Sequence, residues 1–190
     1  MGLDLTIISN HELNEDLENV KDKVLNKLDF VYIDSDLRDY FKSVTRSDSF
    51  KEWNSNSWRF DLMGLKSLKE VVKEDNCICF KGPWAISMRL GLKSYQLDLN
   101  LRWYHFLENK VIQTQIFALM EMINQVFKSE YNIYIPDNGT QSSGYSDLVT
   151  EGFGLDEILA RMKIEIGNPC TSADELISQF NTNENAYLKK

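Results

Sequence analysis

The sequence predicts an α+β fold: an antiparallel or mixed sheet of about five strands with a long central helix and shorter helices packed mainly on one face. Two patterns predict it. Apolar and polar residues alternate along two neighbouring segments, 84–90 and 95–103, and a period of two is typical of a half-buried sheet. Apolar residues then recur every three or four positions from 109 to 128, which is typical of a helix with a broad buried side. Packing the helix on the sheet buries both apolar surfaces.

The two alternating segments predict one hairpin register. Apolar even positions in the first arm must share a face with apolar odd positions in the second arm, so the numbers of opposite residues add up to an odd number. A sum of 185 leaves the connection 91–94, which has a common hairpin length. In this register the pairing extends from Leu90 opposite Tyr95 to Trp84 opposite Leu101.

The polar face of this hairpin has a distinct local charge. Four basic residues and one acidic residue lie between 81 and 102, whereas the chain from 137 to 184 has nine acidic residues and two basic ones. A solvated or internally paired face is the favoured interpretation, but docking on the acidic part of the chain and binding of an anion stay open. Arg89 and Asp98 are diagonal neighbours that can pair, which leaves Arg102 as the better candidate for holding an anion.

The segments before the hairpin alternate between strands and helices. A strand is predicted at 3–8 and a helix directly after it, because Ser9 and Glu12 have the spacing of a capping box. The short apolar stretch 30–33 fits either a strand or a packing loop, and a second helix follows it. The remaining segments predicted in this part are a polar loop, a strand, a short helix and a strand: 45–57, 58–63, 65–74 and 77–80.

The segments after the long helix are shorter. A strand at 132–135 ends in a Pro-Asp-Asn-Gly turn, and the next loop has the glycine spacing of a phosphate-binding loop without its lysine. A mobile connection is therefore favoured there. A further helix ends at Gly167, in a position that favours glycine, and Ser172 begins a last helix with capping-box spacing. The tail 181–190 has little to bury and is expected to be disordered.

Composition sets the broad class of the protein. The chain has 190 residues, of which 43% are hydrophobic, enough for a single globular domain at 1–180. Without a long apolar run or an export signal, a cytoplasmic location without membrane contact is expected. The net charge of −8 argues against nucleic acid as a partner. The chain has three cysteines, including Cys77 and Cys79, and two histidines, and their spacing is not that of metal ligands. Neither a metal nor a cofactor is therefore expected.

Two functions stay open, and a non-catalytic protein-binding module is favoured. A toxin-neutralising (immunity-like) or regulatory protein fits the acidic charge and the lack of a catalytic motif. Two aromatic residues in an otherwise polar loop, Phe50 and Trp53, either anchor the loop on the fold, which is favoured, or are candidates for the partner surface. The partner is expected to be another protein, and a basic one fits the charge. The oligomeric state stays open.

The alternative is an enzyme or a small-ligand-binding protein with a pocket near the 136–152 loop. Loops carry many functional carboxylates, and the candidate ligand-binding residues of this hypothesis come from the loop and from the hairpin: Asp137, Tyr145, Glu151, Arg89 and Arg102. No residue is a candidate catalytic nucleophile, because no nucleophile motif is present. A concave pocket with a strongly shifted carboxylate pKa favours this alternative, and a flat acidic or aromatic patch favours the binding module.

Overall fold

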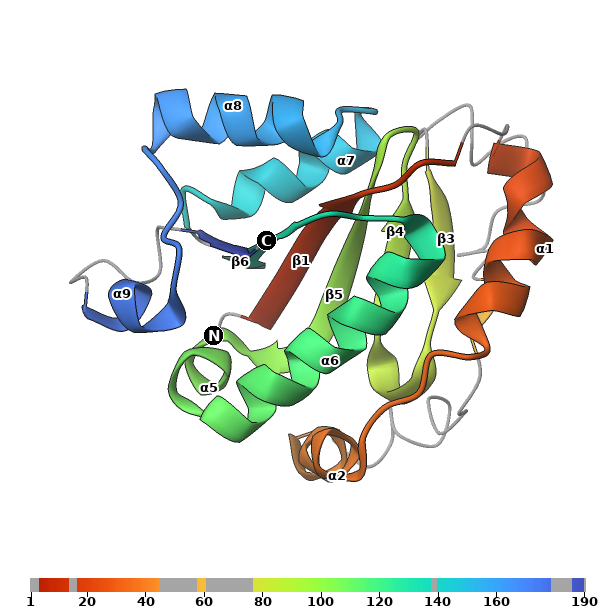
Figure 1. Cartoon of the computed structure of the whole chain (residues 1–190), viewed down its shortest axis with the longest axis horizontal. Coiled ribbons are helices and arrows are strands. Elements are labelled where there is room, and N and C mark those ends of the chain that lie inside the picture. Colours follow the sequence, from red (N-terminus) through yellow and green to blue (C-terminus); the bar gives the residue numbers. More distant parts are fainter. Residues whose placement is uncertain are drawn as a thin grey trace.

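The computed structural model describes residues 4–13, 17–44, 58–60, 77–137, 140–178 and 186–189. They form an α+β fold around one antiparallel sheet with the strand order β2-β3-β4-β5-β1-β6-β7 (Figure 1). The strands are β1 (Asp4–Asn10), β2 (Arg59–Phe60), β3 (Ile78–Lys81), β4 (Ser87–Leu90), β5 (Ser94–Arg102), β6 (Asn132–Pro136) and β7 (Tyr187–Lys189). The predicted fold class is confirmed, with seven strands in the sheet.

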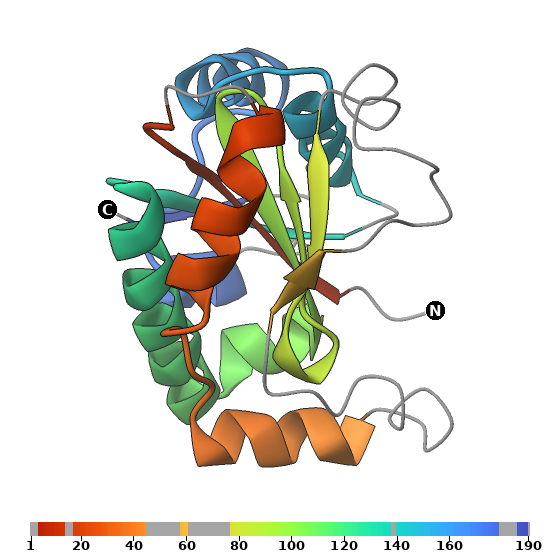
Figure 2. The same cartoon turned by 90° about the vertical axis from the view of Figure 1, so that its right-hand side faces the viewer.

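Helices cover both faces of the sheet, one face more fully than the other. The helices are α1 (Leu17–Leu28), α2 (Ser35–Val44), α5 (Trp103–Glu108), α6 (Lys110–Phe127), α7 (Asp147–Thr150), α8 (Leu155–Glu165) and α9 (Ala173–Ser178), with the 3-10 turns η1 (Pro83–Ala85) and η2 (Ser143–Ser146). Figure 2 shows α1 and α6 along one side of the sheet and α7 and α8 at its upper end. The first group encloses the main apolar core, and the second encloses a smaller core on the opposite face.

The main core lies between β5, β1 and α6. On β5 the side chains of Tyr95, Leu97, Leu99 and Leu101 are at most 2% exposed, so the predicted alternation places them on the covered face. On α6 the buried apolar positions have the predicted helical spacing: Ile112, Ile116, Leu119, Met120, Ile123 and Phe127. Val111 is also apolar but is 58% exposed, so the buried side of α6 is narrower there than the apolar pattern predicts. The sheet therefore covers one side of α6 only.

Both ends of α6 are set by local backbone geometry. Asn109 is the N-cap, and its Oδ1 accepts hydrogen bonds of 3.1 Å from the backbone N–H groups of Val111 and Ile112. Lys128 ends the helix in the left-handed conformation, with φ 57°, and its N–H donates to the carbonyl of Asn124. The chain then turns into β6, so residues of α6 and β6 come to line one cavity.

The predicted hairpin register is confirmed over its inner half. Leu90 lies opposite Tyr95 and Ser87 lies opposite Asp98, as the sum of 185 requires. The expected pair of Trp84 is not formed in the described chain, because residues 83–85 turn into η1 and Trp84 adopts a left-handed conformation with φ 58°. On its other edge, β5 pairs with β1 from Ser94 to Arg102.

Near the N-terminus one prediction is wrong, and for a second segment the loop is confirmed over the strand. Ser9 does not cap a helix, because β1 continues beyond it and its hydroxyl donates to the backbone oxygen of Tyr131 at 2.8 Å. The stretch 30–33 is a loop that leaves two aromatic side chains exposed, Phe30 at 84% and Tyr32 at 69%. The apolar composition of that stretch therefore does not mark a core strand.

The expected disordered tail contains a strand. Residues 187–189 form β7, which pairs antiparallel with β6, so the prediction of disorder is wrong there. The Tyr187 ring stacks on Tyr134 with a centroid distance of 5.3 Å, and the N–H of Cys170 donates to the carbonyl of Ala186 at 2.8 Å. These contacts come from distant parts of the chain, which the local composition does not reveal. Residues 181–185 lie outside the described residues.

Candidate functional site

An acidic cleft of about 380 Å³ opens on the second face of the sheet, beside η2 and α7. Its floor includes the polar row of β5, Gln96, Asp98 and Asn100, because the alternating apolar residues of this strand face the main core. On the two sides of β5, Thr6 of β1 is paired with Asp98 and Arg89 of β4 is paired with Gln96. The strand order therefore assembles the cleft from segments that are distant in sequence.

Four aspartates line the cleft from four parts of the fold: Asp4, Asp98, Asp137 and Asp147. Asp137 Oδ1 accepts a hydrogen bond of 2.8 Å from the backbone N–H of Asp4, which joins the start of β1 to the end of β6. Burial raises the pKa of the Asp4 carboxyl; the charge of Arg102 lowers it and that of Asp137 raises it further, and the net direction is upward. An additional negative charge is therefore unfavourable in this part of the cleft.

Gln96 is the buried polar side chain on the floor of the cleft. It is 3% exposed, and its Nε2 donates to Asp98 Oδ1 at 2.6 Å. The Thr6 hydroxyl donates to the same oxygen at 2.9 Å. Within the described part of the chain, Gln96 Oε1 is buried and has no hydrogen-bond partner. An unpaired acceptor beside a cleft favours a ligand that brings a donor.

The two arginines predicted to bind a ligand have different surroundings. Arg102 Nη1 lies 2.8 Å from Asp4 Oδ1, so its charge is neutralised by an ion pair. Arg89 lines the cleft, and its side chain forms no ion pair or hydrogen bond with another described residue. The expected pair between Arg89 and Asp98 is not formed, and the Asp98 carboxylate accepts instead from two neutral donors, Thr6 and Gln96. The ranking of Arg102 above Arg89 assumed the opposite arrangement, so its structural premise is wrong, and the ranking itself stays a prediction.

The loop residues of the ligand-binding hypothesis do not meet in one pocket. Tyr145 and Glu151 line a separate cleft of about 320 Å³. The Tyr145 hydroxyl donates to Glu165 Oε2 at 2.8 Å, and burial together with this hydrogen bond raises the pKa of Tyr145 to about 12. Of the five predicted residues, only Arg89 and Asp137 line the acidic cleft.

Some residues of the predicted and observed sites could be identified from the sequence, and others could not. Phe50 and Trp53 lie outside the described residues. Gln96 belongs to the polar row that the alternation identifies, although its burial depends on neighbouring strands. Asp4 was missed because it joins the cleft only through the insertion of β1 between β5 and β6. No local pattern around Asp4 signals that position.

Comparison with known proteins identifies no relative of this chain. No protein family, no curated protein and no solved structure matches it. Among the described residues, no group of Cys, His, Asp and Glu side chains is arranged to hold a metal ion, and no helix is both long and apolar enough to cross a membrane.

Proposed function

We propose that this protein is a non-catalytic binding module that recognises a basic segment of another protein through the acidic cleft. Toxin-neutralising (immunity-like) and regulatory proteins act in this way. The observation that carries the proposal is the unpaired Gln96 Oε1 on the floor of a cleft lined by four aspartates. Such a surface offers hydrogen-bond acceptors and an excess of negative charge.

An arginine side chain is the best chemical match for this cleft. A guanidinium group has five N–H donors in one plane and stays charged, so it can bond a carboxylate and a neighbouring amide oxygen together. The four carboxylates outnumber the two guanidinium groups near them, those of Arg89 and Arg102. An additional cation therefore gains attractive charge interactions, and charge-assisted hydrogen bonds are about twice as strong as neutral ones.

A protein partner fits the cleft better than a small free cation does. The cleft of about 380 Å³ has room for one long basic side chain, and a single side chain binds tightly only when surrounding contacts exclude water. The net charge of −8 adds long-range attraction for a basic protein and increases its association rate.

Fluorescence anisotropy with a labelled peptide of alternating arginine and glycine tests the proposal. Asp98→Asn and Asp147→Asn each remove one carboxylate from the cleft, and each is expected to raise the Kd by about tenfold. Arg89→Gln removes the cation that competes with the peptide, so the Kd of the peptide for this variant should fall. The effects should shrink as the salt concentration rises, because salt screens charge interactions.

Matched variants outside the cleft separate a specific site from bulk charge. Asp29→Asn removes an exposed carboxylate after α1, and Lys163→Gln removes an exposed cation on α8. Neither should change the Kd by more than about twofold. If Asp29→Asn weakens binding as much as Asp147→Asn does, the proposal is contradicted. If spermine binds as tightly as the peptide, the cleft is a site for small cations and the protein partner is refuted.

One observation favours the alternative of an enzyme or a small-ligand-binding protein near the 136–152 loop. The pKa of Asp4 is raised inside the cleft, mainly by burial, and raised carboxyl groups occur at catalytic sites. However, Asp4 is ion-paired with Arg102. The described residues that line the cleft include no histidine, cysteine or lysine that could act with it. The binding module therefore stays the proposed function.

A further inference from the structure

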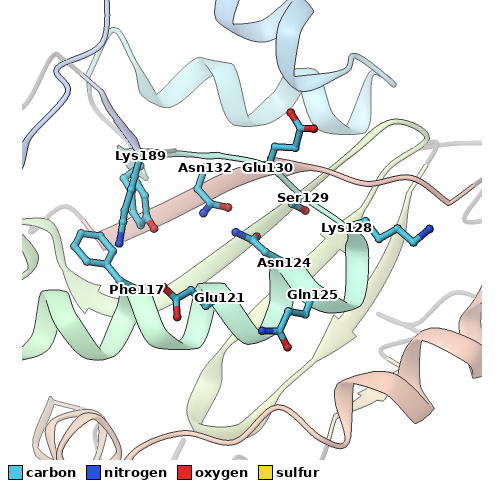
Figure 3. A pocket seen from close by; sticks show the side chains of 10 residues that line it. Phe117, Glu121, Asn124, Gln125, Lys128, Ser129, Glu130, Asn132 and Lys189 are labelled. Atoms are coloured by element: carbon cyan, nitrogen blue, oxygen red, sulfur yellow. The ribbon is translucent and has the colours of Figure 1, made fainter.

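A larger cavity of about 620 Å³ lies beside the C-terminal half of α6, where β6 and β7 form its other wall (Figure 3). Small-molecule sites commonly have volumes of about 300–1,000 Å³. No residue that lines the acidic cleft lines this cavity. It also faces the main core rather than the second face of the sheet, because its residue Tyr134 belongs to that core. The cavity is therefore separate from the proposed protein-binding site.

Two buried polar side chains of β6 face this cavity. Asn132 and Tyr134 are two positions apart, so they lie on the same face of the strand, and they are 5% and 0% exposed. The Asn132 side chain is the hydrogen-bonding neighbour of the Tyr134 hydroxyl oxygen, but among the described residues the hydroxyl proton has no acceptor and Asn132 Oδ1 has no donor. Buried polar groups are nearly always hydrogen-bonded. Two unpaired groups on one cavity wall therefore point to a ligand that supplies their partners.

A cation and an anion lie next to these two groups. The Lys189 ammonium lies 3.5 Å from the centroid of the Phe117 ring, and partial burial lowers the pKa of Lys189 while the charge of Glu121 raises it. Figure 3 shows the side chains of Lys189, Phe117 and Glu121 at one end of the cavity, whereas the Lys128 side chain extends away from them. This end of the cavity therefore presents one positive and one negative group.

Asn124 places a further polar group on the α6 wall. Its Oδ1 accepts a hydrogen bond of 2.9 Å from the Tyr95 hydroxyl, which fixes the orientation of its amide. In Figure 3 the side chains of Asn124 and Asn132 extend toward the same space from opposite walls. Polar groups of both kinds, donors and acceptors, thus converge on one small volume between α6 and β6.

We propose that this cavity binds a small zwitterion of the amino-acid class, with its carboxylate held by Lys189 and the Tyr134 hydroxyl and its ammonium held by Glu121 and Asn132 Oδ1. The hydroxyl donates to the carboxylate, and the two oxygen acceptors receive N–H groups of the ammonium. Both unpaired groups of β6 therefore gain a partner. Because the two protein charges are equal and opposite, they favour a ligand with both charges over a simple anion or cation.

The test is thermal unfolding of the full chain with each of the twenty amino acids, followed by calorimetric titration of those that raise the Tm. A chemically related subset is expected to bind, selected by the space left for the side chain. Tyr134→Phe and Glu121→Gln should each weaken its binding by about tenfold, since each removes one contact to a charged group. Acetate and methylamine, which carry only one of the two charges, should bind more weakly than the amino acid.

Tyr131→Phe is the matched control, because its hydroxyl contacts Asp156 and the residue does not line the cavity. It should bind the ligand like the unmodified protein. The Tm of unliganded Tyr134→Phe shows separately that this variant folds. The proposal is overturned if no amino acid shifts the Tm, or if Tyr134→Phe binds with unchanged affinity. The proposal is also overturned, in favour of a simple anion site, if acetate binds with the same affinity as the amino acid and Glu121→Gln leaves the acetate affinity unchanged.

Discussion

Replacing Tyr134 with phenylalanine is expected to raise the stability of the unliganded protein by about 1–3 kcal/mol, the usual cost of a buried polar group without a partner. The change removes only the hydroxyl, which is buried and whose proton has no acceptor in the described chain. The ring keeps its packing, because it stacks on Phe106 and on Tyr187 with centroid distances of 5.3 Å. Burial also raises the pKa of Tyr134 well above its ordinary value, as expected for a hydroxyl that has lost its hydration.

Thermal and urea unfolding measure this effect. For a chain of this size, 1 kcal/mol changes the Tm by about 2–4 °C, and an unchanged urea m-value shows that the same unit unfolds. Tyr95→Phe is the matched control: Tyr95 is equally buried, but its hydroxyl donates to Asn124 at 2.9 Å. Its removal should lower stability by about 0.5–1.5 kcal/mol. An equal loss in Tyr134→Phe would refute the reasoning, because the Tyr134 hydroxyl would then have a partner of its own.

Three further predictions concern the core, the contact between the layers and the pH dependence. Leu99→Ala should cost about 2–5 kcal/mol in urea unfolding, and a loss below about 1 kcal/mol would remove this residue from the core. Gly91→Ala should cost about 1–3 kcal/mol, because the new Cβ would lie 2.4 Å from the carbonyl oxygen of Val149; an unchanged Tm would contradict this. Burial lowers the pKa of His11 below 6.5, and its Nδ1 accepts from the N–H of Leu13. The unfolded chain therefore binds the proton first, so stability should fall as the pH drops through 6.5. His11→Gln should lose less stability between neutral pH and about pH 5; an equal loss would exclude His11 as the cause.

Local patterns predict the elements whose buried side follows from their own periodicity. The alternation in β5 and the helical spacing in α6 both reflect one buried face, whatever packs against it. The inner hairpin register follows from the same parity, and the structure confirms Leu90 opposite Tyr95. Gly167 follows α8 with φ 94°, a conformation that the nearest residues define without help from the rest of the fold.

The candidate site follows from sequence only in part. The polar row of β5 is visible as an alternation, and it supplies Gln96 and Asp98 to the cleft. Asp137 and Tyr145 are close in the chain but do not converge on one pocket, contrary to the expectation. The strand end and the 3-10 turn direct the two side chains into separate clefts. The sequence also does not reveal that the Tyr145 hydroxyl has a hydrogen-bond partner, because the fold brings Glu165 to it from a distant helix.

The sequence by itself determines the α+β class, the long helix and the buried face of the two hairpin strands, because these depend on residues close together in the chain. Only the tertiary structure decides which polar groups meet. β1 enters between β5 and β6, which brings Asp4 to the acidic cleft, and β7 joins the far edge, which places Lys189 over Phe117. Strand order depends on how whole apolar faces pack. The alternation of apolar residues specifies which face of a strand is buried, but it does not specify which strand lies next to it in the sheet. The charges and unpaired groups of both sites therefore come together only when the complete sheet has formed.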